Sequence, residues 1–224
     1  MQQTPVHDQH NPDLLSMLQP TTSKICEVGC SSGALAREFK KISPQVHYTG
    51  IEIDPGYAEL ARKYCDRVYT LNIDDVPEYF WEIHSDISCW VFGDTLEHLK
   101  DPWKVLSKIN KFIPKNGYVV ACIPNMQHWS IQARLSVGDL RYQDSGLLDR
   151  THLRWFTRQT IHEMFAQAGF EITEEKSRIF PEPMSESVLA LIENMANLFG
   201  YDKKIALQDA MPLQYVVKAV SNRN

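Results

Sequence analysis

The chain has 224 residues, of which 43% are apolar and 10% aromatic, so it is long enough to bury a sizeable core within one domain. Its formal charge of -5 argues against broad attraction to nucleic acid or anionic lipid. The sequence contains no Cys-x-x-Cys pair, no basic-then-apolar leader and no apolar run of about 18 residues. We therefore expect a reduced, cytoplasmic protein in which residues 1–10 form a mobile tail and residues 11–224 form a single domain.

Strand and helix patterns alternate over the first half of the chain. The predicted strands are 24–28, 46–53, 68–71, 87–93 and 118–123. The predicted helices between them are 34–41, 56–64 and 102–112, the last with Asp101 as its N-cap. Short alternating units of this kind predict an α/β fold with a doubly wound, mostly parallel sheet.

The second half of the chain departs from this alternation. Residues 126–156 are too long for an ordinary connection and mix aromatic with charged residues, so we expect a structured cap over the site. A helix is predicted over 158–168, and segments 170–180 and 213–220 can pair as closing antiparallel strands. Residues 185–210 have apolar side chains at helical spacing, and we interpret them as an inserted helix that completes the core. Alternatively, this helix forms a homodimer contact or a wall of the substrate site.

The segment from Ile25 to Gly33 is the most informative part of the chain. It joins an apolar strand to a helix through a tight turn, where Gly29 permits a sharp bend and Gly33 permits close packing of the helix on the strand. Glu52 ends the next strand, and its carboxylate can accept hydrogen bonds from both hydroxyls of a ribose. The turn has Ser31 where a dinucleotide site has its middle glycine, which favours an adenosine cofactor without phosphates.

Three ordered motifs closely resemble those of class I S-adenosylmethionine-dependent methyltransferases: Glu27-x-Gly29-Cys30-x-x-Gly33, Gly50-Ile-Glu52-Ile-Asp54 and Asp94-Thr-Leu-Glu97-His98-Leu. The resemblance implies S-adenosylmethionine as the cofactor and a Rossmann-like, seven-stranded sheet with an antiparallel final strand. It also implies the residues that contact the cofactor: Glu27, Gly29, Cys30, Gly33, Glu52, Ile53, Asp74, Asp94 and Leu96. The segment 124–157 looks like a subgroup associated with surface-polysaccharide and other glycan biosynthesis.

Three of these motif positions have an alternative interpretation. Glu27 can brace the glycine turn instead of binding the ammonium group of the cofactor. Asp75 can replace Asp74 as the acceptor for the adenine amino group. Glu97 can brace the helix that follows it as readily as line the pocket.

Transfer of a sulfonium methyl group is an in-line displacement, so the protein must position the acceptor and, for a hydroxyl, supply a base. His152 is the candidate base, because it lies in a dense polar run in which Asp149 can orient it. A structural, hydrogen-bonded histidine is the alternative. Further polar residues are candidates for the acceptor site: His98, Asn125, His128, Arg150 and Arg154.

The two arginines can clamp a phosphate or carboxylate of the acceptor, or form salt bridges within the protein. At the predicted strand ends, His, Cys and acidic residues do not occur at the spacing typical of a metal site, so we expect no required metal. The alternative is a divalent ion that binds a sugar diol. We expect methyl transfer to an oxygen, or less readily a nitrogen, of a sugar, a nucleotide-linked sugar or a related small polar metabolite. A catalytically silent partner that binds the cofactor and a nicotinamide-dependent oxidoreductase are the competing hypotheses.

Overall fold

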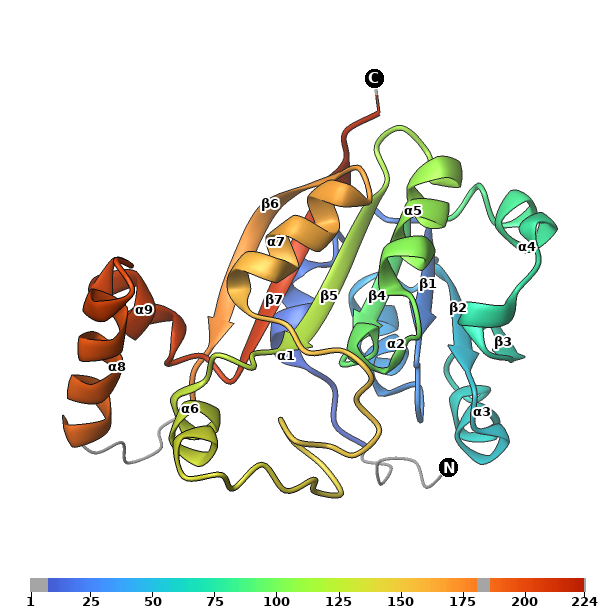
Figure 1. Cartoon of the computed structure of the whole chain (residues 1–224). Helices are drawn as coiled ribbons and strands as arrows, with labels where there is room; N and C mark the ends of the chain where they lie inside the picture. The colour runs from blue at the N-terminus through green and yellow to red at the C-terminus, as the bar shows by residue number, and fades with distance from the viewer. Residues whose placement is uncertain (1–7, 181–185, 224) are drawn as a thin grey trace.

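A seven-stranded sheet in the order β3-β2-β1-β4-β5-β7-β6 forms the centre of the computed structural model, which describes residues 8–180 and 186–223 (Figure 1). The first five strands are parallel, and β7 runs antiparallel to both of its neighbours. The predicted fold class is therefore confirmed. Most of the predicted tail, residues 1–7, lies outside the described residues. The strands are β1 (Lys24–Val28), β2 (His47–Glu52), β3 (Arg67–Thr70), β4 (Cys89–Gly93), β5 (Tyr118–Pro124), β6 (Phe170–Arg178) and β7 (Gln214–Ser221).

Helices cover both faces of the sheet, as Figure 1 shows. The sequence predicted the helices after β1, β2 and β4, together with the one before β6, and it missed α1, α4 and the helix α6 within the cap. The helices are α1 (Pro12–Met17), α2 (Ala34–Ile42), α3 (Pro55–Ala61), α4 (Glu78–Ile83), α5 (Pro102–Phe112), α6 (Trp129–Ser136), α7 (Arg158–Gln167), α8 (Glu186–Leu198) and α9 (Lys203–Asp209), with short 3-10 helices η1 (Ile73–Asp75) and η2 (Leu96–His98).

The core has two halves, one on each face of the sheet. Strand β4 shows why: Trp90 and Phe92 point to the half that contains α4, α5 and α7, whereas Cys89 and Val91 point to the half with α1, α2 and α3. All four side chains are at most 2% exposed. A strand buried on both faces reads as a continuous apolar run, which is why the sequence pattern located it.

The cap, residues 126–156, lies beyond the carboxyl ends of the strands and contains α6 (Figure 1). Both of its ends are tied down. Met126 donates a main-chain hydrogen bond to Phe156 (2.7 Å), and Leu153 and Arg154 donate to the carbonyl of Glu97 (2.8 and 3.0 Å). The end of the cap is thereby fixed against η2.

The predicted helical insertion differs from our expectation. Its described part forms two helices, α8 and α9, separated at Gly200, whose positive φ of 73° suits a glycine. Leu191 and Leu198 of α8 are 60% and 80% exposed, while Ile192 is buried. The interpretation of this segment as part of the core is therefore wrong for α8, which packs on α9 and α6 instead. Among residues 8–180 and 186–223, the helices lack the length and apolarity needed to cross a bilayer.

Candidate active site

The strand order reverses between β1 and β4, because the chain proceeds from β1 to β2 and β3 on one side and from β4 to β5 on the other. In an open α/β sheet this reversal opens a crevice at the carboxyl edge. The loops that follow β1, β2 and β4 meet there. Most of the predicted cofactor residues lie in these loops or at the ends of β1 and β2, whereas Asp74 follows β3.

The turn after β1 is pressed against the loop after β4. Gly29 has φ 72°, and a Cβ atom added to it would lie 2.6 Å from the Thr95 hydroxyl oxygen. That hydroxyl lies 3.0 Å from the Val28 carbonyl and 3.1 Å from the Gly93 carbonyl. Glycine is required here both for the positive φ and for the close approach.

Two further contacts fix the shape of the turn. A Cβ atom on Gly33 would lie 3.1 Å from the Ala61 Cα, so the close packing that we expected against the strand is made against α3. A Cβ atom on Gly50 would lie 2.5 Å from the Cys30 Sγ, and Cys30 is only 3% exposed. Cys30 therefore fills the space under the turn with its side chain, which leaves only its main chain to face a ligand.

Glu52 fits the ribose role predicted for it. The side chain is 5% exposed, and its two oxygens accept main-chain hydrogen bonds from Ser31 (2.8 Å) and Asp54 (3.0 Å). These bonds hold the carboxylate in one orientation, and each oxygen keeps a second lone pair for a hydroxyl. Ile53, which follows, is 53% exposed and offers an apolar surface beside it. The residues present thus suit an adenosine group.

Glu27 lies under the same turn and is 6% exposed. Burial raises the pKa of its carboxyl group to about 8, although the hydrogen bond from the Tyr48 hydroxyl (2.9 Å) lowers it and the charge of Glu52 raises it further. The group is therefore mostly protonated at pH 7 in this state of the protein. The Tyr48 bond favours the bracing alternative, while a cationic ligand group beside Glu27 would favour its ionised form.

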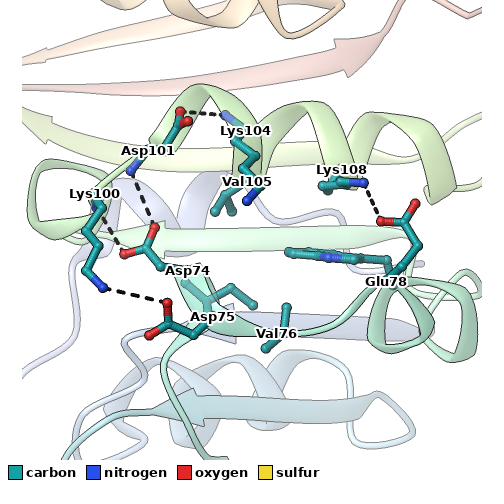
Figure 2. A pocket seen from close by; sticks show the side chains of 11 residues that line it. Asp74, Asp75, Val76, Glu78, Lys100, Asp101, Lys104, Val105 and Lys108 are labelled. Atoms are coloured by element: carbon teal, nitrogen blue, oxygen red, sulfur yellow. Dashed lines mark hydrogen bonds and ion pairs between the residues drawn. The ribbon is translucent and has the colours of Figure 1, made fainter.

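Asp74 joins the segment after β3 to the loop before α5. Its carboxylate accepts main-chain hydrogen bonds from Lys100 (3.0 Å) and Asp101 (3.4 Å), and Asp75 pairs with the Lys100 ammonium at 3.6 Å (Figure 2). A cavity of about 410 Å³ opens beside them, between η1 and α5. Its lining includes Asp74 and excludes Gly29, Glu52 and the other predicted cofactor residues. This geometry favours a bracing role for Asp74.

The two predicted cofactor residues in the loop after β4, Asp94 and Leu96, differ in their exposure. Asp94 is exposed, has φ 52°, and accepts a hydrogen bond from the Gln214 amide (2.5 Å). A positive φ is rare for a residue other than glycine, and it is enriched at functional sites. Leu96, in contrast, is fully buried and belongs to the core half that contains α5. Asp94 can reach a ligand at the edge, whereas Leu96 is packed behind it.

Three chemically active side chains gather where the cap meets η2. Glu97 is 1% exposed, and its Oε1 lies 4.0 Å from the Nε2 of His152. The rings of His98 and His152 are 4.8 Å apart at an angle of 70°. The sequence singled out each residue separately and missed the cluster, because the cap must fold back before His152 meets the other two.

The surroundings of His152 keep its imidazole neutral. Burial lowers the pKa of His152 to about 4, His98 lowers it further, and the charge of Asp149 raises it. The Leu147 carbonyl also raises it, although the Nδ1 atom makes no hydrogen bond of normal geometry. At pH 7 the ring is therefore neutral and carries a lone pair.

Glu97 responds to burial in the opposite direction. Burial raises the pKa of its carboxyl group well above the usual range, and the nearby charges of Asp94 and Asp149 add to the increase, whereas its own backbone lowers it. Burial also lowers the pKa of His98, although the Thr151 carbonyl and Asp149 raise it. Burial therefore favours the protonated form of Glu97.

Asn125 is used within the protein. It is fully buried, and its amide nitrogen donates to the carbonyls of Asp209 and Pro212, both at 2.8 Å. Its amide oxygen accepts a hydrogen bond from the main chain of Gln127 (2.9 Å). The residue ties the start of the cap to the segment before β7, which favours the turn-shaping role over contact with the acceptor.

The other predicted acceptor residues are also engaged. His128 caps α6 and lies 2.8 Å from the Ser130 hydroxyl. Arg150 forms an exposed salt bridge with Asp144 (2.7 Å), one of the internal partners that the sequence offered. Arg154 donates to two main-chain carbonyls. A phosphate clamp made by these arginines would require both to exchange their present partners.

Comparisons with known proteins show the family and the fold. Residues 8–175 match the family model described as a methyltransferase domain. A search of curated proteins finds no match. The fold is similar to that of a methyltransferase in complex with the Haloferax volcanii activator Trm112 (TM-score 0.62, 15% identity, 95% of this chain and 88% of that one).

Two further solved structures have a similar fold. An S-adenosylmethionine-dependent methyltransferase from Archaeoglobus fulgidus has a TM-score of 0.58 and 16% identity, with 90% of this chain and 87% of that one covered. Magnesium protoporphyrin IX methyltransferase from Synechocystis PCC 6803, solved with bound S-adenosylhomocysteine, has a TM-score of 0.60 and 10% identity, with 94% and 81% covered. At these identities the structures show the fold, and the family model adds the relationship. The chain belongs to the methyltransferase domain family and is a class I methyltransferase that depends on S-adenosylmethionine.

Proposed function

We infer that the protein transfers the methyl group to a hydroxyl oxygen of a sugar, a nucleotide-linked sugar or a related small polar metabolite. Nitrogen is the less favoured acceptor atom. The observation that carries the oxygen assignment is the buried, neutral imidazole of His152 beside Glu97. A hydroxyl must lose its proton as it attacks, and a positioned imidazole accepts such a proton.

The cofactor site in this proposal is formed by the three loops at the carboxyl edge. Glu52 binds the ribose hydroxyls, Ile53 lies against the adenosine, and the turn at Gly29 approaches the rest of the molecule with its main chain. S-adenosylmethionine supplies the electrophilic methyl group when bound. The protein needs no covalent intermediate, because a positioned acceptor can attack the methyl carbon directly.

The proposed acceptor class follows from the surface of the cap. Trp155, 45% exposed, and Tyr142, 61% exposed, present aromatic faces on which the C–H face of a sugar ring can stack. Because Arg150 and Arg154 are engaged within the protein, a free sugar is favoured over a nucleotide-linked one. A role in glycan biosynthesis is the physiological extension of this proposal.

The test is incubation of the protein and methyl-labelled S-adenosylmethionine with sugars, nucleotide sugars and carbohydrate extracts, followed by mass spectrometry of the products. We expect a labelled carbohydrate in which the methyl group is on oxygen. Label found on amines, or on apolar metabolites instead of carbohydrates, would overturn the acceptor class. Cofactor binding without label in any of these pools would favour the silent binding partner.

Two variants test the role of His152. His152→Ala should lower turnover by about 100-fold or more while the affinity for S-adenosylhomocysteine persists. The matched control is His162→Ala, because His162 pairs with Glu175 (2.6 Å) on the surface formed by α7 and β6. Equal turnover in both variants would return His152 to a structural role.

A further inference from the structure

Glu97 is a buried carboxyl group without a hydrogen-bond partner. Neither of its oxygens is bonded to any residue that the structure describes. A buried polar group in this condition costs free energy. Of the four buried side-chain atoms left unpaired in the described part of the chain, three belong to Glu97 and His152. This concentration of unused bonding capacity points to a ligand shared by the two side chains.

We propose that Glu97, His98 and His152 together bind a divalent transition-metal ion through one carboxylate oxygen and two imidazole nitrogens. Their ligand atoms lie within 4.8 Å of one another. Ligands of one ion are roughly 3 to 4 Å apart, so side-chain shifts on the order of 1 Å bring them into place. Two imidazoles and one carboxylate suit ions such as Zn²⁺ and Mn²⁺, and they leave coordination positions open for a substrate.

The orientation of His98 supports this assignment. Its Nδ1 atom lies 3.2 Å from the Thr151 carbonyl oxygen and 3.1 Å from the Thr151 hydroxyl oxygen. The hydroxyl donates its proton to Asp149 (2.7 Å), so both oxygens accept from Nδ1. The Nδ1 atom therefore carries the proton, and Nε2 keeps the lone pair that a metal needs. Histidine ligands in proteins are held in this way, with the second ring nitrogen bonded to a carbonyl or carboxylate.

Acidic side chains near the cluster also suit a cation. Asp94 and Asp149 both lie near Glu97. A divalent ion would balance these acidic groups.

A bound ion changes the chemistry assigned to His152, because a neutral imidazole has one nitrogen lone pair and coordination of the ion would use it. The acceptor hydroxyl then loses its proton to solvent while its oxygen is coordinated, since the charge of the ion lowers the pKa of the hydroxyl. The oxygen bonds to the methyl carbon as the carbon–sulfur bond breaks. This step rests on the proposed function, whereas metal binding itself does not. The proposal reverses our sequence-based expectation of no required metal.

The test is metal binding by the full chain after dialysis against EDTA. Titration calorimetry with Zn²⁺ and with Mn²⁺ should give one ion per chain, and Co²⁺ should produce visible absorption typical of nitrogen and oxygen ligands. Glu97→Gln and His98→Ala should each weaken binding by about 100-fold or more, since removal of even an outer-shell partner costs about 10- to 100-fold. His162→Ala and Glu175→Gln, which disrupt the surface pair, should leave affinity unchanged.

Binding of S-adenosylhomocysteine by each variant shows that it is folded. Absence of stoichiometric binding by the unaltered protein would overturn the proposal, as would equal affinity in Glu97→Gln and His98→Ala. The calorimetry needs no acceptor, so a failure to find a methylated carbohydrate leaves this result intact. Conversely, a metal-free protein that still methylates carbohydrates would retain His152 as the base and overturn the role of the ion in the reaction, while calorimetry alone decides whether the ion binds.

Discussion

Gly29→Ala tests the contact between the loops after β1 and β4. The added Cβ atom would lie 2.6 Å from the Thr95 hydroxyl oxygen and 3.1 Å from its methyl carbon, and the residue would keep φ 72°. The positive φ alone costs roughly 1–2 kcal/mol for a residue with a side chain. Displacement of the Thr95 hydroxyl from its carbonyl partners adds about 1 kcal/mol for the lost hydrogen bond. We expect a total loss of about 2–3 kcal/mol in the free energy of unfolding.

Gly138→Ala is the matched control. Gly138 has φ 73°, and no atom lies within 4 Å of the position of its Cβ, so this variant isolates the backbone term. Urea unfolding followed by tryptophan fluorescence measures both variants. A second test adds Thr95→Ala, which removes the two atoms closest to the new Cβ and should make Gly29→Ala as mild as Gly138→Ala. Equal losses in the two single variants, or no rescue by Thr95→Ala, would refute the reasoning.

Three further predictions concern other parts of the structure. Glu52→Gln should weaken binding of S-adenosylhomocysteine by about 1–3 kcal/mol in calorimetry, because charge-assisted hydrogen bonds are lost. The control Glu59→Gln, on the exposed side of α3, should leave the affinity unchanged, and equal affinities in the two variants would remove Glu52 from the ribose site. Because the pKa of Glu27 is raised to about 8, the unfolded chain binds fewer protons than the folded one between about pH 4.5 and 8, so stability should fall as pH rises through that window. Glu27→Gln should flatten this slope in urea unfolding at pH 5.5 and pH 8, and an unchanged slope would contradict the raised pKa. Ile192→Ala, at a buried position of α8, should cost about 2 kcal/mol or more, and Leu198→Ala, at an exposed position, close to nothing; similar losses would contradict the exposed face of α8.

The sheet and the loops at its carboxyl edge could be predicted because their signals are local. Strands such as β4 are apolar on both faces, and the motifs that contain Gly29 and Glu52 each lie within a few residues of one strand end. The position of Glu52 relative to Gly29 then follows from the pairing of β1 with β2. Local patterns and parallel topology were sufficient for this part of the site.

The acceptor side could not be predicted in the same way, because its geometry depends on contacts between distant segments. Asn125 is bonded to Asp209 and Pro212, far along the chain, and this pairing leaves no trace in the sequence around it. The apolar positions of 185–210 suggested a core helix, yet apolar spacing does not reveal whether a face is covered. The break at Gly200 could have been suspected from the glycine alone.

The way the cap is attached separates the surface that meets the acceptor from the position of His152, two properties that an enzyme designer would want to adjust independently. Leu153 and Arg154, near its end, donate hydrogen bonds to the Glu97 carbonyl, and its first residue donates to Phe156. Gly138 and Gly146, in its middle, have no atom within 4 Å of the position of a Cβ. Residues 143–146 are bonded to residues 148–150, whereas the hydrogen bonds found for residues 137–142 stay within 134–142. Exchange of residues 137–142 therefore alters the surface that an acceptor meets without breaking the hydrogen bonds that hold the segment of His152. Acceptor preference in this protein can diverge by replacement of one short segment while the chemical apparatus stays in place.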